Sequence, residues 1–318
     1  MITTNYVYGP VPSRRLGLSL GLNIIPRKTC TLNCIYCQCG RTTCMTITRQ
    51  SFFPIDDILQ EVRAAVKGKR IDYLTFSGEG EPTLNKDIGK IIRLLKKEFK
   101  IPVAVITNST LLFDPEVRRD LYSADLVVPS LDAADPKTFR RLNRAHRTLK
   151  IERILSGLKT FSRYFSGKIY LEIMLVKNIN DSPEHLMELR RLAYEINPDR
   201  THLNTVVRPP AEKFALPLSE DDLIQVQMLF GPETEIAQSP IPKRQKPFKG
   251  DPVKAILAIV QNRPVTEQDL IHSLGISEEK LKPLLSYLVR QKRLQRIKFW
   301  GKVFYEPFPS QFSSASPY

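Results

Sequence analysis

Between residues 17 and 230 the sequence alternates short β-rich runs with amphipathic helical patterns. The strands are predicted at residues 17–25, 72–77, 103–108, 125–131, 169–176 and 201–207. The helices are predicted at residues 55–68, 86–99, 114–122, 135–143, 182–196 and 219–230, and several open with Asp or Ser before Pro or acidic residues, a typical helix N-terminus. This alternation predicts an α/β fold, an incomplete (βα)6 TIM-like barrel with parallel strands. Its active site is expected in the loops that follow the strands.

The composition changes near residue 236, which predicts a second domain. The barrel is assigned to residues 1–235, and the Pro-rich, basic residues 236–250 are predicted to form a linker. A small domain is predicted over residues 251–308, followed by a disordered tail over 309–318.

The small domain is predicted to be a winged helix-turn-helix. Its three helical patterns and its hairpin cover residues 253–264, 265–276, 277–294 and 294–306. Thr266 with Asp269 predicts a capping box, Gly275 a tight turn, and Trp300 with Gly301 the turn of the hairpin. Pro283 is expected to kink or delay the third helix.

All five cysteines lie between residues 30 and 44, four of them in CTLNCIYCQC. The sequence has no signal-peptide pattern and no apolar run near the ~20 residues of a membrane span, so a cytoplasmic protein without membrane contact is expected. In a reducing compartment this spacing indicates metal or redox chemistry rather than disulfides. Cys30, Cys34 and Cys37 can hold three irons of a [4Fe–4S] cluster and leave the fourth iron open. A zinc site completed by Cys39 or Cys44 is the alternative.

The cysteine spacing, with Tyr36 directly before the last cysteine, resembles the signature of the radical S-adenosylmethionine (SAM) superfamily. FSGEGEPTLN after the second strand is similar to that family's Gly-Gly-Glu-Pro element. The resemblance implies a partial barrel of the radical SAM type, with a [4Fe–4S] cluster on Cys30, Cys34 and Cys37 and with SAM as the second cofactor. It also implies SAM contacts from residues at strand ends, namely Tyr36, Gly78, Gly80, Glu81, Pro82, Asn108, Ser130 and Asp132. Taken singly, Asn108, Ser130 and Asp132 are as easily explained as helix caps.

Further segments resemble a radical SAM group classed with the wyosine-tRNA synthases, which implies tRNA modification. They are YGPVPSRRLG, CIYCQ followed by GRTT, SGxGEPTL, LDAADPKTFRRLNRAH and NTVVRPP. On this basis Arg14, Arg15, Asn204 and Arg208 are expected in strand-end loops, where they could bind an anionic substrate. Loop structure or surface charge is the alternative role of these four residues.

The resemblance also implies a reaction. An electron, from a donor such as ferredoxin or flavodoxin, would cleave SAM to methionine and a 5′-deoxyadenosyl radical that abstracts a substrate hydrogen. Cys39 and Cys44 have no place in this pattern. They could ligate an auxiliary cluster, donate a thiol or be unreactive.

The chain carries 48 basic and 33 acidic residues, a formal charge of +15, which favours a polyanionic partner such as RNA. Six basic residues near the hairpin are Arg290, Lys292, Arg293, Arg296, Lys298 and Lys302, and the linker adds Lys243, Arg244, Lys246 and Lys249. With Phe299 and Trp300 they suit phosphate contacts and base stacking, and tRNA is the first candidate. In the alternative, both aromatic residues pack against the barrel and the charges are solvated. A peptide substrate and a metal-sensing DNA-binding regulator are the competing functions.

Overall fold

The computed structural model describes residues 6–13, 15–237 and 250–309. Arg14, most of the predicted linker with its four basic residues, and residues 310–318 of the predicted tail lie outside this range. Among the described residues, no helix is long and apolar enough to cross a membrane.

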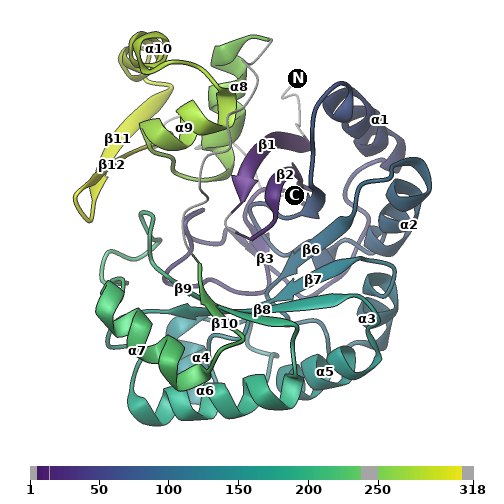
Figure 1. Cartoon of the computed structure of the whole chain (residues 1–318). Helices are drawn as coiled ribbons and strands as arrows, with labels where there is room; N and C mark the ends of the chain where they lie inside the picture. Colours follow the sequence, from purple (N-terminus) through teal and green to yellow (C-terminus); the bar gives the residue numbers. More distant parts are fainter. Residues whose placement is uncertain (1–5, 14, 238–249, 310–318) are drawn as a thin grey trace.

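An eight-stranded sheet forms the larger domain, in the order β1-β2-β5-β6-β7-β8-β9-β10 (Figure 1). The strands from β2 onward pair in parallel, and β1 runs antiparallel to β2. Their bounds are β1 Val7–Ser13, β2 Gly17–Leu22, β5 Tyr73–Phe76, β6 Val103–Thr107, β7 Leu126–Pro129, β8 Lys168–Leu175, β9 Arg200–Thr205 and β10 Thr234–Ile236. The six predicted strands are therefore confirmed, in a mostly parallel α/β sheet.

The strands β1 and β10 were not predicted. Pro10 and Pro12 argue against a strand in the sequence, but β1 is the edge strand of the sheet, where proline is tolerated. β10 has only three residues, Thr234–Ile236, which is too short for an alternating pattern to be recognised.

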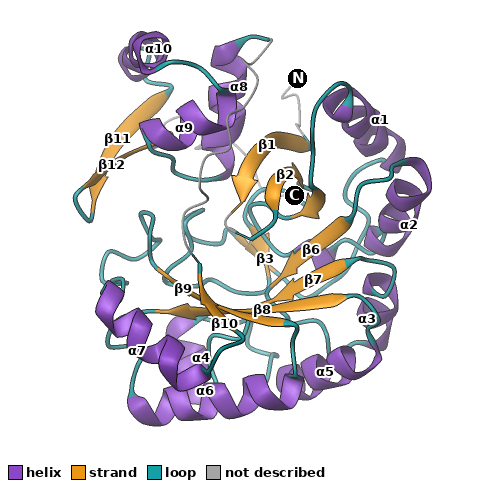
Figure 2. Cartoon of the chain, viewed as in Figure 1, coloured by secondary structure: helices purple, strands orange, loops and turns teal. Residues whose placement is uncertain are grey.

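Helices cover the outer face of this sheet (Figure 2). Their bounds are α1 Ile55–Val66, α2 Ile88–Glu98, α3 Pro115–Leu121, α4 Pro136–Leu142, α5 Ile151–Tyr164, α6 Pro183–Ile196 and α7 Glu220–Phe230. Asp114, Asp135, Ser182 and Ser219 cap α3, α4, α6 and α7 through their side chains, as the sequence suggested.

Helix α5 was missed by the sequence analysis. Its N-cap, Lys150, makes no side-chain capping hydrogen bond, so the usual start signal is absent. Gly157 in its interior lowers the helix propensity of the segment. Tertiary contact explains the glycine, because a Cβ at Gly157 would lie 2.4 Å from the backbone nitrogen of Phe113. The helix can therefore pack directly onto the loop after β6.

Strand β8 shows how the barrel is built. Ile169, Leu171, Ile173 and Leu175 are buried in the main core with residues of the surrounding helices, whereas the alternate residues Tyr170, Glu172 and Met174 face the barrel interior. An apolar layer of Leu16, Ala104, Leu126 and Val128 fills part of this interior, with Tyr170 packed against it. Polar groups lie above this layer, towards the strand C-terminal ends.

The residues after 250 form three helices and a hairpin. Their bounds are α8 Pro252–Asn262, α9 Glu267–Leu274, α10 Glu278–Arg290, β11 Leu294–Phe299 and β12 Lys302–Pro307. The Thr266 and Asp269 capping box is present, and Gly275 adopts a left-handed conformation after α9. Trp300 and Gly301 form the two-residue turn of the hairpin, with φ of 48° and 74°.

Pro283 does not delay α10, which begins at Glu278 and continues through it. The missing N–H of Pro283 would have bonded the carbonyl of Glu279, in the first turn, so only one hydrogen bond near the helix start is lost. The C-terminal unit packs on β1, where Tyr8 and Val11 join the core of α8, α9 and α10.

Candidate functional site

The cysteine loop follows β2, and backbone hydrogen bonds to Lys28 hold its two ends together. The carbonyl of Lys28 accepts hydrogen bonds from the backbone nitrogens of Thr43 and Cys44, each at 3.1 Å. The short strands β3, Thr29–Cys30, and β4, Cys44–Met45, then pair in parallel. These contacts close the loop that carries the thiols.

This loop rests on the segment that contains Gly80 and Glu81, at the end of β5. The backbone nitrogen of Glu81 donates to the carbonyl of Thr29 at 3.2 Å, and that of Lys28 donates to the carbonyl of Glu79 at 3.0 Å. A Cβ at Gly80 would lie 1.9 Å from the Thr29 oxygen. Gly80 is thus required for the close approach of the cysteine loop.

Glu81 ties two strand ends together. One carboxylate oxygen accepts hydrogen bonds from Thr83, through its backbone nitrogen at 3.1 Å and its hydroxyl at 2.6 Å, and from the Thr107 hydroxyl at 2.7 Å. The other accepts from the backbone nitrogen of Asn108 at 2.7 Å. Burial raises the pKa of Glu81, and its position fixes Asn108 at the end of β6.

Two neighbours of Glu81 were also predicted as SAM contacts. Pro82 is buried and opens the short helix η1, Pro82–Leu84. Gly78 has a φ of 155°, and a Cβ there would lie 2.6 Å from Oδ1 of Asn23. Both residues therefore shape the loop after β5.

Each of the three thiols faces a nitrogen of a neighbouring side chain. Asn108 Nδ2 lies 3.5 Å from Cys30 Sγ and Asn143 Nδ2 3.4 Å from Cys34 Sγ. Lys28 Nζ lies 3.9 Å from Cys37 Sγ. N–H donors of this kind stabilise sulfur that carries negative charge, which is the state of a thiolate bound to iron.

Lys28 and Asn143 are not among the site residues predicted from the sequence. Asn143 stands in the LDAADPKTFRRLNRAH segment, and Lys28 stands two residues before the first cysteine. Their position next to motif residues was the available signal. Only the fold brings Asn143, at the end of α4, to the thiol of Cys34.

The ionisation of the thiols depends on the same neighbours. Burial raises the pKa of Cys30 to about 12 and raises that of Cys34 well above its usual value. A hydrogen bond with the Cys39 thiol, together with the charge of Lys28, lowers the pKa of Cys37. Cys39 therefore lies beside the three-cysteine motif, whereas Cys44 is exposed in β4.

Tyr36 and Asp132 meet beside this motif. The Tyr36 hydroxyl and Asn143 Nδ2 donate to one oxygen of Asp132, the latter at 3.1 Å, and the backbone nitrogen of Met174 donates to the other at 2.9 Å. Burial raises the pKa of Asp132 to about 6. Ser130 contributes its carbonyl, which accepts from the Ser109 hydroxyl at 2.8 Å.

The donor set fits a [4Fe–4S] cluster. Three thiols come from one short loop, and each has its own N–H donor. A cluster takes one thiolate per iron, so its ligands need not converge on one point. Within the described ranges no three His, Cys, Asp or Glu side chains are placed to hold a single metal ion.

The predicted substrate residues separate into two groups. Arg15 forms an ion pair with Glu172 inside the barrel, and Asn204 Nδ2 donates to the same carboxylate at 3.0 Å. Arg208 instead donates to the carbonyl of Pro264 at 3.1 Å, so it contacts the C-terminal unit. Glu172 is not among the predicted residues, although a lone carboxylate within the apolar run IYLEIMLV is a usable signal.

The β11–β12 hairpin reaches the barrel beside the cysteine loop. Phe299 packs on an apolar cluster that includes Ile35, Leu142 and Val206. Trp300 is 65% exposed at the turn. Of the two aromatic residues proposed for stacking, Phe299 packs on the barrel and Trp300 remains exposed.

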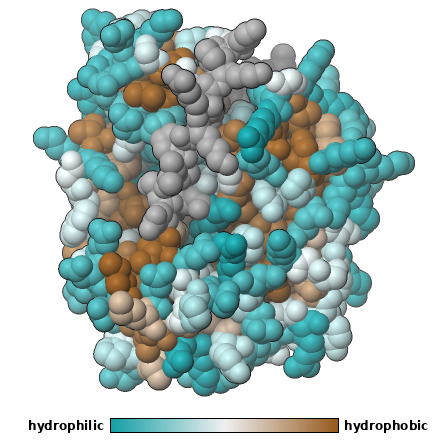
Figure 3. Space-filling model, viewed as in Figure 1, coloured by the Kyte–Doolittle hydropathy of each residue, from teal (hydrophilic) through white to brown (hydrophobic). Residues whose placement is uncertain are grey.

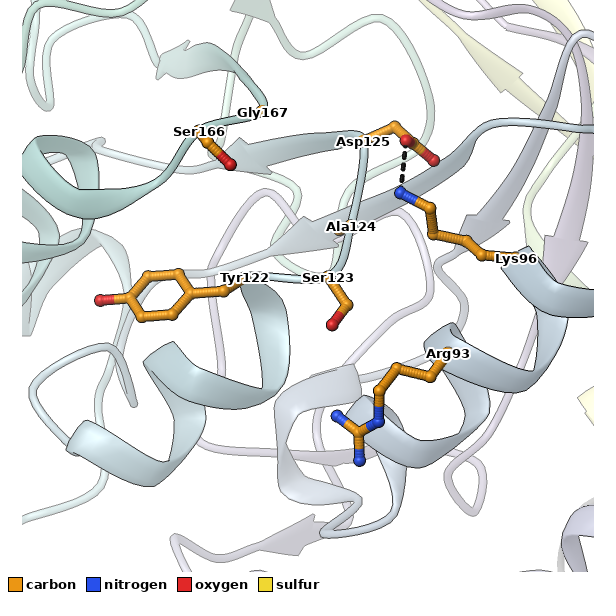
Figure 4. Close-up of a pocket in the computed structure, with 8 residues that line it drawn as sticks. All are labelled: Arg93, Lys96, Tyr122, Ser123, Ala124, Asp125, Ser166 and Gly167. Carbon is orange, nitrogen blue, oxygen red and sulfur yellow. Dashed lines mark hydrogen bonds and ion pairs between the residues drawn. The ribbon is translucent and has the colours of Figure 1, made fainter.

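A separate pocket of about 470 Å³ lies at the opposite end of the strands (Figure 4). It is lined by Arg93, Lys96, Tyr122, Ser123, Ala124, Asp125, Ser166 and Gly167. Lys96 forms an ion pair with Asp125 at 2.6 Å there. Arg93 and Lys96 belong to α2, and the other six residues directly precede β7 or β8. The N-terminal end of such a barrel serves stability rather than chemistry.

The face of the molecule shown in Figure 3 carries both polar and apolar side chains.

The chain is similar to known proteins over most of its length. The Radical SAM superfamily matches residues 24–190. UPF0026 protein MJ1312 of Methanocaldococcus jannaschii is 35% identical over 311 residues, which cover 94% of this chain and 94% of that protein. GTPase Obg of Brachyspira hyodysenteriae is 36% identical over 299 residues, 92% of this chain but only 44% of that protein.

A solved structure shares the fold. The radical SAM methyltransferase from Sphaerobacter thermophilus superposes with a TM-score of 0.55 at 18% identity. The superposition covers 69% of this chain and 65% of that one, which is about the extent of the barrel domain.

Proposed function

This chain belongs to the radical SAM superfamily, and we propose that Cys30, Cys34 and Cys37 hold the [4Fe–4S] cluster that the family uses together with SAM. When bound, these cofactors supply an electron and a 5′-deoxyadenosyl radical that abstracts a hydrogen atom from the substrate. We propose that the substrate is an RNA, with tRNA as the first candidate, as the resemblance to the wyosine-tRNA synthase group suggests. An electron donor such as ferredoxin or flavodoxin completes the reaction.

The matching of three thiols with three N–H donors carries this proposal. Asn108, Asn143 and Lys28 each approach one of the sulfur atoms within 4 Å. A structural role for the cysteines would not require polar partners at every sulfur, because a buried free thiol behaves as a small apolar group. The three N–H donors stabilise negative charge on the sulfur atoms.

The predicted SAM contacts divide by what they do in the fold. Gly80, Glu81 and Pro82 shape the segment under the cysteine loop, and the oxygens of Glu81 are committed to that segment and to Asn108. Tyr36 and Asp132 are hydrogen-bonded to each other beside the cysteine motif. We propose that the backbone at Gly78 and Gly80 and the side chains of Asn108, Ser130 and Asp132 bind SAM.

We propose that the polar layer inside the barrel receives the reacting part of the substrate. Arg15, Glu172 and Asn204 form one connected group there. The ion pair is almost enclosed, with 11% and 12% of the two side chains exposed. In so low a dielectric a correctly placed substrate group is held strongly, and water is excluded from a reactive radical.

RNA binding is proposed for the C-terminal unit, which we interpret as a winged helix-turn-helix domain over residues 251–308. The six basic residues from Arg290 to Lys302 are all exposed, and within the described part of the chain none of them forms an ion pair. Because Phe299 anchors the hairpin beside the cysteine loop, RNA held by this surface would reach the barrel mouth. Exposed cations and Trp300 suit phosphate contacts and base stacking.

Anaerobic reconstitution tests the cluster. We expect about four irons per chain and visible charge-transfer absorption, and neither should survive the replacement of Cys30, Cys34 and Cys37 by alanine. With dithionite and SAM, the reconstituted protein should form 5′-deoxyadenosine. Zinc as the bound metal, or full iron loading without 5′-deoxyadenosine, would contradict the proposal.

The RNA proposal is tested by charge removal. Replacing Arg296, Lys298 and Lys302 by glutamine should weaken tRNA binding and reduce the slope of its salt dependence by about one unit for each phosphate that these side chains bind. Replacing Lys90, Lys97 and Lys100, exposed residues near α2, gives the charge-matched control. If the two triple variants bind alike, the peptide substrate becomes the better hypothesis.

A further inference from the structure

Lys28 is a buried cation at the cysteine loop. It is 6% exposed, and among the residues that the structure describes it is the only lysine or arginine in the buried core. Its ammonium donates to the carbonyl of Gly40 and lies 3.9 Å from the sulfur of Cys37. A buried charge costs several kcal/mol unless other groups compensate it, so this placement requires an explanation.

Most of the contacts that close the loop at Lys28 come from its backbone, and the ammonium adds one, to the carbonyl of Gly40. The backbone of Lys28 makes the closing contacts, to Glu79 through its nitrogen and to Thr43 and Cys44 through its oxygen. Its φ of 57° is a conformation that glycine or asparagine adopts more easily. A lysine here therefore adds a charge to a position whose backbone role another residue would perform with less strain.

The carboxylate of Glu79, a residue whose backbone contacts Lys28, is paired with another cation. Glu79 forms an ion pair with Arg27, with 3.0 Å between Nε and the carboxylate oxygen. The Lys28 ammonium lies 3.9 Å from the sulfur of Cys37, close enough for its charge to act on that atom. The sulfur of Cys37 is the acceptor next to Gly40 that can take up negative charge when it is bound to iron.

The three donors around the thiols are not equivalent. Asn108 and Asn143 offer neutral amides to Cys30 and Cys34, whereas Lys28 offers a full positive charge to Cys37. A reduced cluster carries one more negative charge than an oxidised cluster. Hydrogen bonds and positive charge at the sulfur atoms therefore stabilise the reduced state and raise the reduction potential.

We propose that Lys28 is a positioning residue that acts through Cys37 to raise the reduction potential of the cluster. This inference rests on the proposed function, since it requires the cluster on Cys30, Cys34 and Cys37. Its consequence is an easier first electron transfer to the enzyme. The site that accepts the electron is thus tuned from within the cysteine loop itself.

The test compares Lys28→Met and Lys28→Gln, which remove the charge, with Lys28→Arg, which keeps it. Lys90→Met, at an exposed position of α2, is the control for removal of one charge elsewhere. Each reconstituted protein is analysed for iron and sulfide and then titrated by dithionite, with the reduced cluster followed by electron paramagnetic resonance. We expect equal iron content, a lower midpoint potential in the two neutral variants, and near-wild-type potentials in Lys28→Arg and Lys90→Met.

Three results would overturn the inference. Unchanged potentials in the neutral variants would remove the electrostatic role. An equal shift in Lys28→Arg, or failure of both neutral variants to hold iron while Lys28→Arg holds it, would assign Lys28 to loop assembly instead. If the wild-type protein holds no cluster, the proposed function fails first, and iron analysis shows this before any titration.

Discussion

The side-chain amide of Asn143 lies 3.4 Å from the sulfur of Cys34 and 3.1 Å from the carboxylate of Asp132. One residue at the end of α4 thereby connects the cysteine loop to the end of β7. This contact joins a proposed cluster ligand to a proposed SAM contact without either cofactor. It also leads to the first prediction.

Replacing Asn143 by alanine should destabilise the apo-protein and weaken iron retention. Asp132 is buried and would lose a hydrogen bond to its carboxylate, so we expect the free energy of unfolding to fall by about 1–3 kcal/mol. Urea unfolding and iron analysis measure the two effects. Arg141→Ala, at an exposed position of the same helix, should change neither, and equal behaviour of the two variants would contradict this role.

Replacing Gly80 by alanine should displace the cysteine loop. The new Cβ would lie 1.9 Å from the backbone oxygen of Thr29, and relief requires movement of main chain, so we expect a destabilisation of about 3 kcal/mol and little iron binding. Gly68→Ala meets no atom within 4 Å at a φ of 69°, so only about 1 kcal/mol of backbone strain is expected. Similar unfolding curves for the two variants would refute the packing argument.

Glu79 should make stability depend on pH. Burial raises the pKa of its carboxyl group to about 7, above the ordinary value of 4.5. The folded state therefore binds the proton more tightly than the unfolded state, and the stability that this adds below pH 4.5 is lost as the pH rises through 7. Relative to wild type, apo Glu79→Gln should gain about 3 kcal/mol between pH 4.5 and 7.5 in urea unfolding. A difference that stays constant with pH would contradict this.

Cys39 and Cys44 should be dispensable for the cluster. Cys39 contacts Cys37 but has no place in the three-cysteine motif, and Cys44 is exposed. We expect the Cys39→Ala, Cys44→Ala double variant to keep about four irons and to form 5′-deoxyadenosine. Loss of several irons would instead reveal an auxiliary cluster.

Trp300 should matter for RNA binding but not for folding. Its ring is largely exposed, and stacking on an unpaired base is worth about 1–3 kcal/mol, so Trp300→Ala should weaken tRNA binding about tenfold with unchanged urea unfolding. Val303→Ala, at an exposed position of β12, is the matched control. Loss of stability with unchanged affinity would assign Trp300 to packing.

The sequence by itself determined the strand and helix alternation, because each of the six strands carries its own apolar run between caps and turns. It also determined the position of the thiols, since Cys30, Cys34 and Cys37 lie on one short loop after β2. In both cases residues close together in the chain were sufficient to predict the structure. The same is true of the capping box at Thr266 and of the hairpin turn at Trp300.

The tertiary structure alone decided which groups surround those thiols. Asn108 and Asn143 come from segments far apart in the chain, and nothing in the sequence pairs either side chain with a particular cysteine. Helix α5 forms without a side-chain cap because packing against the sheet supplies what its N-terminus lacks. Phe299 packs on an apolar cluster of the barrel and not on the predicted stacking surface, because the fold brings that cluster into contact with the hairpin. Burial depends on neighbours that only the folded chain brings together.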